Sequence, residues 1–350
     1  MNRDRLEQIH ASVSLILADS ALPGAAIAAY IDGELVLETS VGARDLQRTV
    51  PLPVDARFYI YSITKTLIAA AILHQVNTGQ LDLEAPIQQY WPEFPIATPI
   101  TLRQILSHTS GLPDYGGLAA YHEAVKVSPG FPWSKQDYWD VAHTHGLRFA
   151  PGTGWAYSNI GYLALKNLLE RTTGRSLQKS LDALFFRPLE LVHTSVATTL
   201  DDAADLTPGY TQALGGDEML NMTQRYHPGW VSHGVVISTA SELAAMIDAL
   251  FSGQILELSL VNAMAQPIHS LGPHSPLQNV ACGLGLFIDT ASPYGSVMGH
   301  SGGGPGYSTA AFHFAMLAGS PTTIVAATNQ DGDNVGVDIA YAVARALAEV

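Results

Sequence analysis

Apolar residues near the start of the chain follow first a helical and then a strand pattern. An amphipathic helix is predicted by the residues that recur every three or four positions, which are Leu6, Ile9, Val13, Ile16 and Leu17. Two apolar runs, 25–30 and 34–39, come next and are joined by Asp32-Gly33, a dipeptide typical of hairpin turns. The chain is therefore predicted to begin with a helix and a β-hairpin.

The last third of the chain repeats these patterns. Strands are predicted for residues 283–289, 309–314 and 322–327, and Asp331-Gly332 then marks a turn. A closing helix is predicted by the helical spacing of Ile339, Val343, Leu347 and Val350.

The middle of the chain has a different character. From about residue 61 to 230 it consists of helical segments separated by loops that contain Pro and Gly, such as 110–113 and 150–154. We therefore predict an α+β protein with an antiparallel sheet and flanking helices, built from residues 1–60 and 231–350. A mainly helical domain, residues 61–230, is inserted between them, and the active site is expected in the cleft between the two.

Composition limits the partners and the compartment. The 350 residues are 47% apolar, enough for a large core, and the net charge of −14 repels nucleic acids. No run of 18 apolar residues occurs, so no membrane span is expected. The single cysteine, Cys282, excludes an internal disulfide and is predicted to be a buried free thiol. The start of the chain has no signal-peptide pattern, so the protein is expected to be cytoplasmic. If a signal peptide had been removed from the start, a periplasmic or secreted location would be expected instead.

The strongest candidate for chemistry is Ser62-Ile63-Thr64-Lys65, an S-x-x-K pattern. Residues three apart share a helix face, so Lys65 can lie beside the Ser62 hydroxyl and accept its proton. From Phe58 to Leu81, Lys65 is the only charged residue, and the apolar run 67–73 predicts a buried helix. A second match, Ser176 to Lys179, is interpreted as a helix cap followed by a solvated lysine.

Two later segments are also candidates. Tyr157-Ser158-Asn159 precedes an apolar helix, so Tyr157 can be a structural aromatic and Asn159 a cap, or both can serve a site. His300-Ser301-Gly302-Gly303 lies in a Gly-rich stretch. It can form a tight turn, or an edge strand whose glycines let a substrate backbone approach.

The order S-x-x-K, Y-x-N and [K/H]-[S/T]-G resembles the β-lactamase and penicillin-binding-protein family. The likeness is greatest to its class C β-lactamase, DD-peptidase and family VIII esterase branches. Segments 106–113 and 234–243 also resemble hallmark segments of that family. The resemblance implies a β-lactamase/transpeptidase-like fold, which agrees with the two-part layout predicted above.

The resemblance also implies roles for individual residues. Ser62 would attack the substrate and become acylated, while Lys65 supplies positive charge and can take the proton. Tyr157 would act as general base and then as acid towards the leaving group. Asn159 would orient Lys65 and the substrate, and the backbone N–H groups of Ser62 and Gly303 would bind the oxyanion. Ser301 and Gly302 would line the substrate edge with His300.

His300 stands where many family members have a lysine. A histidine is mostly neutral at pH 7.5, which weakens recognition of the carboxylate that penicillins and cephalosporins carry, and it predicts activity that responds to pH between about 5.5 and 8. We therefore predict a serine hydrolase that acts through a covalent acyl-enzyme on a small ester or amide. The alternative substrates are a β-lactam, D-Ala-D-Ala peptides (carboxypeptidase activity) and D-amino-acid amides or peptides (D-aminopeptidase activity).

Other interpretations of the sequence compete with this one. Residues 299–303 spell G-x-S-x-G, but the order of acid and histidine that an α/β-hydrolase needs does not follow. His143-Thr144-His145 lacks a third ligand nearby, so neither a metal nor another cofactor is expected. A non-catalytic binding or sensing module is the alternative of another class, against which the retention of Ser62, Lys65 and Tyr157 argues. Loops around Tyr115, Trp133 and Trp230 are expected to set specificity, and the oligomeric state is left open.

Overall fold

The computed structural model describes residues 3–215 and 218–349, so the predicted helix position Val350 lies outside the described residues. The helices are α1 (Arg3–Asp19), α2 (Thr64–Asn77), α3 (Leu102–Leu106), α4 (Ala119–Val127), α5 (Lys135–His145), α6 (Asn159–Thr173), α7 (Leu177–Leu181), α8 (Ala240–Phe251), α9 (Leu258–Met264) and α10 (Val335–Ala348). Short 3₁₀ turns are η1 (Tyr61–Ile63), η2 (Ile87–Gln89), η4 (Asp201–Ala203) and η5 (Pro228–Trp230), and η3 (Asp182–Phe186) is a π turn.

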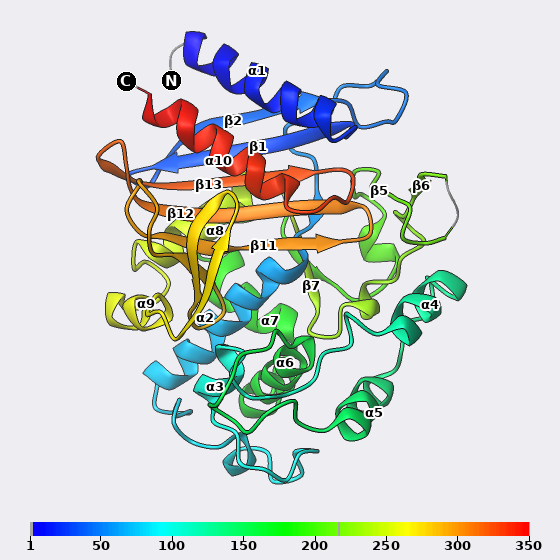
Figure 1. Ribbon diagram of the computed structural model, residues 1–350, viewed down its shortest axis with the longest axis vertical. Helices are drawn as coiled ribbons and strands as arrows, with labels where there is room; N and C mark the ends of the chain where they lie inside the picture. Colours follow the sequence, from blue (N-terminus) through cyan, green and yellow to red (C-terminus); the bar gives the residue numbers. More distant parts are fainter. Residues whose placement is uncertain (1–2, 216–217, 350) are drawn as a thin grey trace.

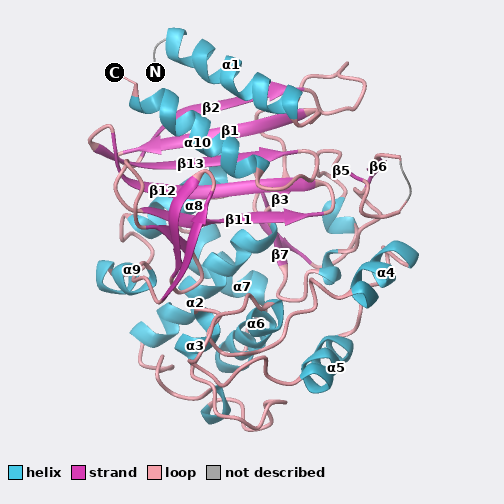
Figure 2. Cartoon of the chain, viewed as in Figure 1, coloured by secondary structure: helices cyan, strands magenta, loops and turns pink. Residues whose placement is uncertain are grey.

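The strands make one large sheet and two small ones (Figure 2). They are β1 (Gly24–Ile31), β2 (Glu34–Gly42), β3 (Phe58–Tyr59), β4 (Ser195–Ala197), β5 (Tyr210–Thr211), β6 (Leu220–Asn221), β7 (Val235–Ser238), β8 (His269–His274), β9 (Leu277–Cys282), β10 (Phe287–Asp289), β11 (Val297–Gly304), β12 (Tyr307–Leu317) and β13 (Ser320–Thr328). The large sheet is antiparallel, in the order β2-β1-β13-β12-β11-β10-β9-β8. The predicted α+β class with an antiparallel sheet is confirmed, whereas the division into domains stays a prediction.

Each face of the large sheet packs against its own set of helices. Alternate residues of β1 point to opposite faces, as strand geometry requires. Ala25, Ile27 and Ala29 belong to the core formed with α1 and α10, which lie side by side across that face (Figure 1). Ala26 and Ala28 belong to a second core, which contains α8 and the helices of the central region.

The predicted end elements are largely confirmed. β1 and β2 form the expected hairpin around Asp32-Gly33, and α10 is the expected closing helix. The strand predicted at 283–289 is wrong in its first half, because β10 begins at Phe287. Gly285 breaks the extended pattern: its φ is +75°, and its N–H donates to Leu106 O rather than to a neighbouring strand.

The central region supplies the helix that carries Ser62 and Lys65. The residues of α2 from Thr64 to Leu73 are all buried, as the predicted buried helix requires. α2 packs against α6 and α7, so its first turn is held at the place where the central helices meet β11 (Figure 1). Among the described residues, no helix is long and apolar enough to cross a membrane.

Candidate active site

Ser62 lies in the short turn η1 directly before α2. The preceding residue, Tyr61, has a φ of +44°, a left-handed conformation that is costly for a bulky residue. Its hydroxyl donates to Pro305 O, and its ring packs where a side chain at Gly304 would otherwise lie. These contacts hold the turn, so that Ser62 remains partly exposed at the start of a buried helix.

Lys65 is completely buried and lies next to Ser62. Its Nζ is 2.9 Å from Ser62 Oγ and 3.2 Å from Nε2 of His233. Burial lowers the pKa of Lys65 well below its usual 10.5, and the carboxylate of Asp114 opposes this only in part. The N-terminal end of the α2 dipole also disfavours a positive charge there. These effects favour an uncharged amine, which can accept a proton.

Tyr157 approaches the serine–lysine pair from the loop before α6. Its ring stacks on His108 at 4.3 Å, and Lys65 Nζ lies 4.9 Å from the ring centre. Burial raises the pKa of Tyr157, and its hydrogen bond with Ser62 reduces that effect without cancelling it. The side chain is therefore a phenol at neutral pH.

The start of α6 fixes the position of Tyr157. The cap of the helix is Ser158, whose hydroxyl accepts the N–H of Gly161, and not Asn159. The N–H of Ser158 donates to His108 Nδ1, and the N–H of Asn159 donates to Asp114 Oδ1. The same backbone that caps the helix therefore also holds His108 and Asp114 beside the site.

The third motif lies on β11, so the tight-turn alternative is wrong. Residues 300–304 pair with β12, whereas the pairing of β11 with β10 ends at Gly299. One edge of the motif is therefore free of β10. A side chain at Gly302 would begin 2.2 Å from Ile60 O, whereas Gly303 has open space around it. Ser301 lies within the strand and not at a strand-to-helix turn, which excludes the nucleophile-elbow interpretation.

His300 is buried between two aromatic rings. Its ring lies 4.9 Å from Phe287 and 6.2 Å from Tyr157, and its Nδ1 is in hydrogen-bond contact with Ser301 O. Burial lowers the pKa of His300 to about 3, and the nearby Lys65 acts in the same direction. A buried, neutral His300 does not support the expected change of activity between pH 5.5 and 8, which stays a prediction.

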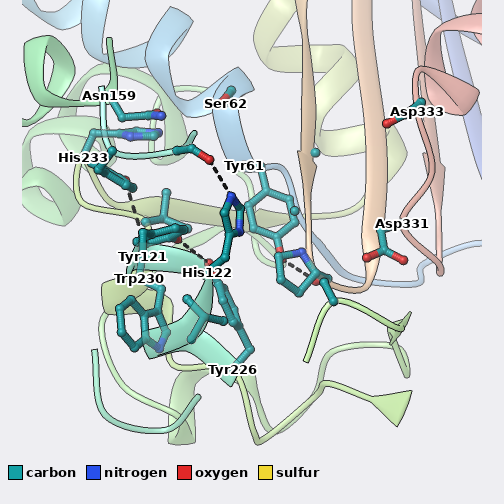
Figure 3. A pocket seen from close by; sticks show the side chains of 18 of the residues that line it. Tyr61, Ser62, Tyr121, His122, Asn159, Tyr226, Trp230, His233, Asp331 and Asp333 are labelled. Carbon is teal, nitrogen blue, oxygen red and sulfur yellow. Dashed lines mark hydrogen bonds between the residues drawn. The ribbon is translucent and has the colours of Figure 1, made fainter. Parts of the chain in front are cut away.

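Ser62 opens on a cavity of about 380 Å³ (Figure 3). Its lining residues are Tyr61, Ser62, Tyr115, Gly116, Tyr121, His122, Val125, Asn159, Ala213, Tyr226, Trp230, Val231, His233, Gly303, Gly304, Pro305, Asp331, Gly332 and Asp333. In Figure 3, Tyr121, Tyr226 and Trp230 gather on one side, and Asp331 and Asp333 lie on another. No lysine or arginine belongs to this lining, as far as the structure describes the chain.

Three of the predicted site residues line this cavity. Ser62, Asn159 and Gly303 line it; Tyr157 lines an adjoining hollow, and Ser301 lines a third. Of the three aromatic residues expected to set specificity, Tyr115 and Trp230 line the cavity. Trp133 lies behind them, with its ring 6.1 Å from that of Trp230.

Sequence reasoning missed His233, which touches Lys65, and the two aspartates. His233 comes from the loop between η5 and β7, and no sequence pattern at that position distinguishes it from a buried structural histidine. The sequence pattern at Asp331 indicates only a turn. The glycines next to His233 and Asp331 were the only sequence signal at these positions. Such glycines predict a turn, but they do not predict which side chain enters a site.

The remaining candidates have structural places. His143 and His145 are exposed on the last turn of α5, and Ser176 caps α7 by accepting the N–H of Lys179. Cys282 is buried, and its thiol donates to Ser107 O. Over residues 3–215 and 218–349, no group of three or more His, Cys, Asp or Glu is placed to hold a metal ion.

An antiparallel sheet packed on helices, with a buried lysine one helical turn after a cavity-lining serine, is an architecture of serine hydrolases. The chain belongs to the Beta-lactamase family, whose family model matches residues 9–349. The resemblance seen in the sequence motifs is thereby confirmed.

Individual relatives differ in their named activities. Penicillin-binding protein 4* of Bacillus subtilis (strain 168) is 27% identical over 290 residues, 79% of this chain and 62% of that protein. Esterase EstB of Burkholderia gladioli is 31% identical over 187 residues, 49% of this chain and 47% of that protein. The chain therefore spans less than two thirds of these curated relatives. The crystal structure of a D-stereospecific amidohydrolase from Streptomyces sp. has a TM-score of 0.77 and 26% identity, covering 95% of this chain and 98% of that one.

Proposed function

We propose that this protein hydrolyses small esters or amides through an acyl-enzyme on Ser62. The observation that carries the proposal is the contact between Ser62 Oγ and the buried Lys65 Nζ, at the edge of a cavity large enough for a small substrate. An amine whose pKa is lowered by burial is a suitable base for a serine hydroxyl, which is otherwise a weak nucleophile.

The proposed reaction uses the side chains in a fixed order. Ser62 Oγ attacks the carbonyl carbon while its proton moves to Lys65 Nζ, and the negative carbonyl oxygen is stabilised by the N–H groups of Ser62 and Gly303. The phenol of Tyr157 gives its proton to the leaving group and regains one from Lys65. Water then enters in place of the leaving group, and the same steps release the acid. Because Tyr157 is a phenol, Lys65 takes the role of base that the family resemblance had given to Tyr157.

The lining of the cavity favours substrates with uncharged acyl groups over substrates with anionic ones. Tyr115, Tyr121, Tyr226 and Trp230 offer aromatic walls, and the charged residues of the lining are acidic. A substrate carboxylate would lose hydration here without meeting a cation, because the neutral His300 stands at the position of the family lysine. This supports esters or amides with apolar acyl groups, with β-lactams and D-Ala-D-Ala peptides as the weaker alternatives.

A substrate panel tests the proposal. The panel contains p-nitrophenyl esters, a chromogenic cephalosporin and D-amino-acid amides, measured with the wild-type chain and with Ser62→Ala. We expect kcat/KM to be highest for an ester or amide without a carboxylate, and activity to disappear in Ser62→Ala. Hydrolysis of the cephalosporin as the best substrate would contradict the proposed selectivity. Activity that survives in Ser62→Ala would contradict the proposed nucleophile.

D-amino-acid amides are a second candidate because of the acidic side of the cavity. Asp331 is half-buried there, and its carboxylate accepts a hydrogen bond from the Thr211 hydroxyl. A carboxylate in that place can attract the ammonium group of an amino-acid amide, and the Streptomyces relative is named as a D-stereospecific amidohydrolase. Asp331→Asn should then raise KM for a D-amino-acid amide and leave KM for an uncharged ester unchanged. An equal change for both substrates would remove this candidate.

A further inference from the structure

His233 makes a contact with Lys65 that no motif foresaw. Its Nε2 lies 3.2 Å from Lys65 Nζ, although the two residues are 168 positions apart. Both side chains are buried, and His233 also lines the cavity on which Ser62 opens. The serine–lysine pair therefore has a third member, which contacts the same amine that contacts Ser62.

The other ring nitrogen of His233 is unpaired. Nδ1 is buried and has no hydrogen-bond partner among the described residues. The tautomer of a histidine is set by the hydrogen bonds that its two nitrogens make, so here the contact with Lys65 decides it. A buried polar atom without a partner is costly, which indicates that the ring is kept in this place for the contact on its other side.

The hydrogen-bond chemistry selects one arrangement as productive. An uncharged lysine amine has N–H donors and a single lone pair. If His233 donated to that lone pair, the lone pair would not be available to the Ser62 proton. If Nε2 instead accepts an N–H of Lys65, the lone pair can point to Ser62 Oγ, which lies 2.9 Å from Nζ. Nε2 can continue to accept after Lys65 has taken the proton, so the contact persists through the reaction.

The electrostatic surroundings keep His233 in the accepting state. Burial lowers the pKa of His233 well below 6.5, and Lys65 lowers it further whenever it carries a proton. The other titratable groups around the Lys65–His233 pair are Asp114, His108, Tyr157, Tyr162, Lys166 and His300. Two bases in contact in a buried site hold one proton between them more readily than two. A neutral imidazole therefore faces Lys65.

We propose that His233 is a positioning residue, which accepts a hydrogen bond from Lys65 Nζ and so directs the amine at Ser62 Oγ. This inference rests on the proposed hydrolase function. His233 acts through Lys65 and forms no bond to the substrate. Its effect should therefore appear in the rate of acylation and in the pH dependence, while substrate affinity changes little.

The test compares His233→Leu, which removes the acceptor at similar volume, with His233→Gln, which keeps an acceptor oxygen. The acylation burst with p-nitrophenyl acetate is measured against pH for the full chain. His233→Leu should acylate on the order of 10²-fold more slowly, with KM within about twofold of wild type. The acidic limb of its pH–rate profile should move to lower pH. The lost acceptor stabilised protonated Lys65, so its removal lowers the pKa of Lys65. His233→Gln should recover most of the rate and the wild-type limb.

A matched control is His313→Leu, which removes another buried histidine; His313 stacks on Phe251 and hydrogen-bonds to Thr323. The control should leave the acidic limb where it is in wild type. If His233→Leu keeps the wild-type rate and limb, or if His233→Gln is as slow as His233→Leu, the inference is overturned. A wild-type chain that gains no acyl group at Ser62 would instead overturn the hydrolase function, and the inference with it.

A measurement on the wild-type chain avoids dependence on a folded variant. The ¹⁵N chemical shifts of the histidine rings report which nitrogen carries the proton. His233 should have a protonated Nδ1 and an unprotonated Nε2 from pH 6 to 8, with its signals assigned by their absence from His233→Gln. A protonated Nε2 in the free protein would contradict the proposed direction of the hydrogen bond.

Discussion

At the scale of single residues, Lys65 is surrounded by histidines that do not add positive charge to the site. Lys65 is buried among His108, His233 and His300, and burial lowers the pKa of each of these histidines. Neutral imidazoles do not stabilise a tyrosinate, and burial raises the pKa of Tyr157. In the proposed mechanism, the proton that leaves Ser62 therefore goes to the amine of Lys65.

Replacing Lys65 should separate activity from stability. In Lys65→Met the base is lost but the shape of the side chain is nearly kept, so acylation of Ser62 should fall by about 10²- to 10⁴-fold. Thermal unfolding should occur at the same or a higher temperature, because a buried amine is replaced by an apolar group. Burst kinetics and calorimetry measure the two effects. Acylation at the wild-type rate in this variant would exclude Lys65 as the base.

The pH dependence of the wild-type enzyme follows from the same pKa shifts. Protonated Lys65 has no lone pair, so kcat/KM should rise with pH through the pKa of Lys65 and then level off. Burial lowers that pKa, so the rise should end well below pH 10.5. A pH–rate profile with a non-ionising ester measures it. Activity that increases only above pH 10 would show that Lys65 is an ordinary, charged lysine in the free enzyme.

At the scale of elements, the site depends on how closely β11 approaches η1. Gly302 lies against the carbonyl of Ile60, and Thr309 from β12 also hydrogen-bonds to that carbonyl and to Gly302 O. A side chain at residue 302 would force the strand away from the turn that carries Ser62. At Gly303, one residue further along, no atom lies within 4 Å of the position that an added methyl group would occupy, and the residue lines the cavity.

Alanine substitutions at these two neighbouring glycines should have opposite effects on stability and activity. Gly302→Ala should lower the free energy of unfolding by about 1–3 kcal/mol, because the added methyl meets backbone that cannot move aside. Gly303→Ala should leave stability within about 0.5 kcal/mol of wild type but lower kcat/KM, because its methyl enters the cavity. Denaturant unfolding and ester hydrolysis distinguish them. Equal destabilisation of both variants would refute the assigned approach of β11 to η1.

Local sequence patterns foresaw those elements whose residues interact with near neighbours. The hairpin at Asp32-Gly33, the buried helix after Lys65 and the ordered motifs at Ser62 and Tyr157 were all predicted. The start of β10 was not, because Gly285 bends the chain towards Leu106, far away in the sequence. The place of His233 was missed for the same reason: only the packed fold brings its loop to α2.

At the scale of the whole molecule, the site is assembled from distant segments. Ser62 comes from η1, Tyr157 from the loop before α6, His233 from the loop before β7 and Gly303 from β11. Residues of these elements pack into the two cores, so the site exists only in the complete fold. The buried histidines of the site consequently link its geometry to global stability.

The free energy of unfolding should therefore depend on pH through the protonation of His300. Its pKa is about 3 in the fold and about 6.5 when unfolded, so the unfolded chain binds more protons below pH 6.5. Stability from this group is present above pH 6.5 and is lost as the pH falls towards 3. Between pH 5.5 and 4.5, wild type should lose about 1.4 kcal/mol more than His300→Gln. If the free energies of unfolding of the two proteins fell equally over this pH range, His300 would not be buried in its neutral form.

The central claim is that Ser62 forms the acyl-enzyme, and intact-protein mass spectrometry after a short pulse with an activated ester tests it most directly. We expect one added acyl group, located by peptide mapping on Ser62 and absent from Ser62→Ala. Addition at Ser301 or Ser176, or equal labelling of Ser62→Ala, would contradict it.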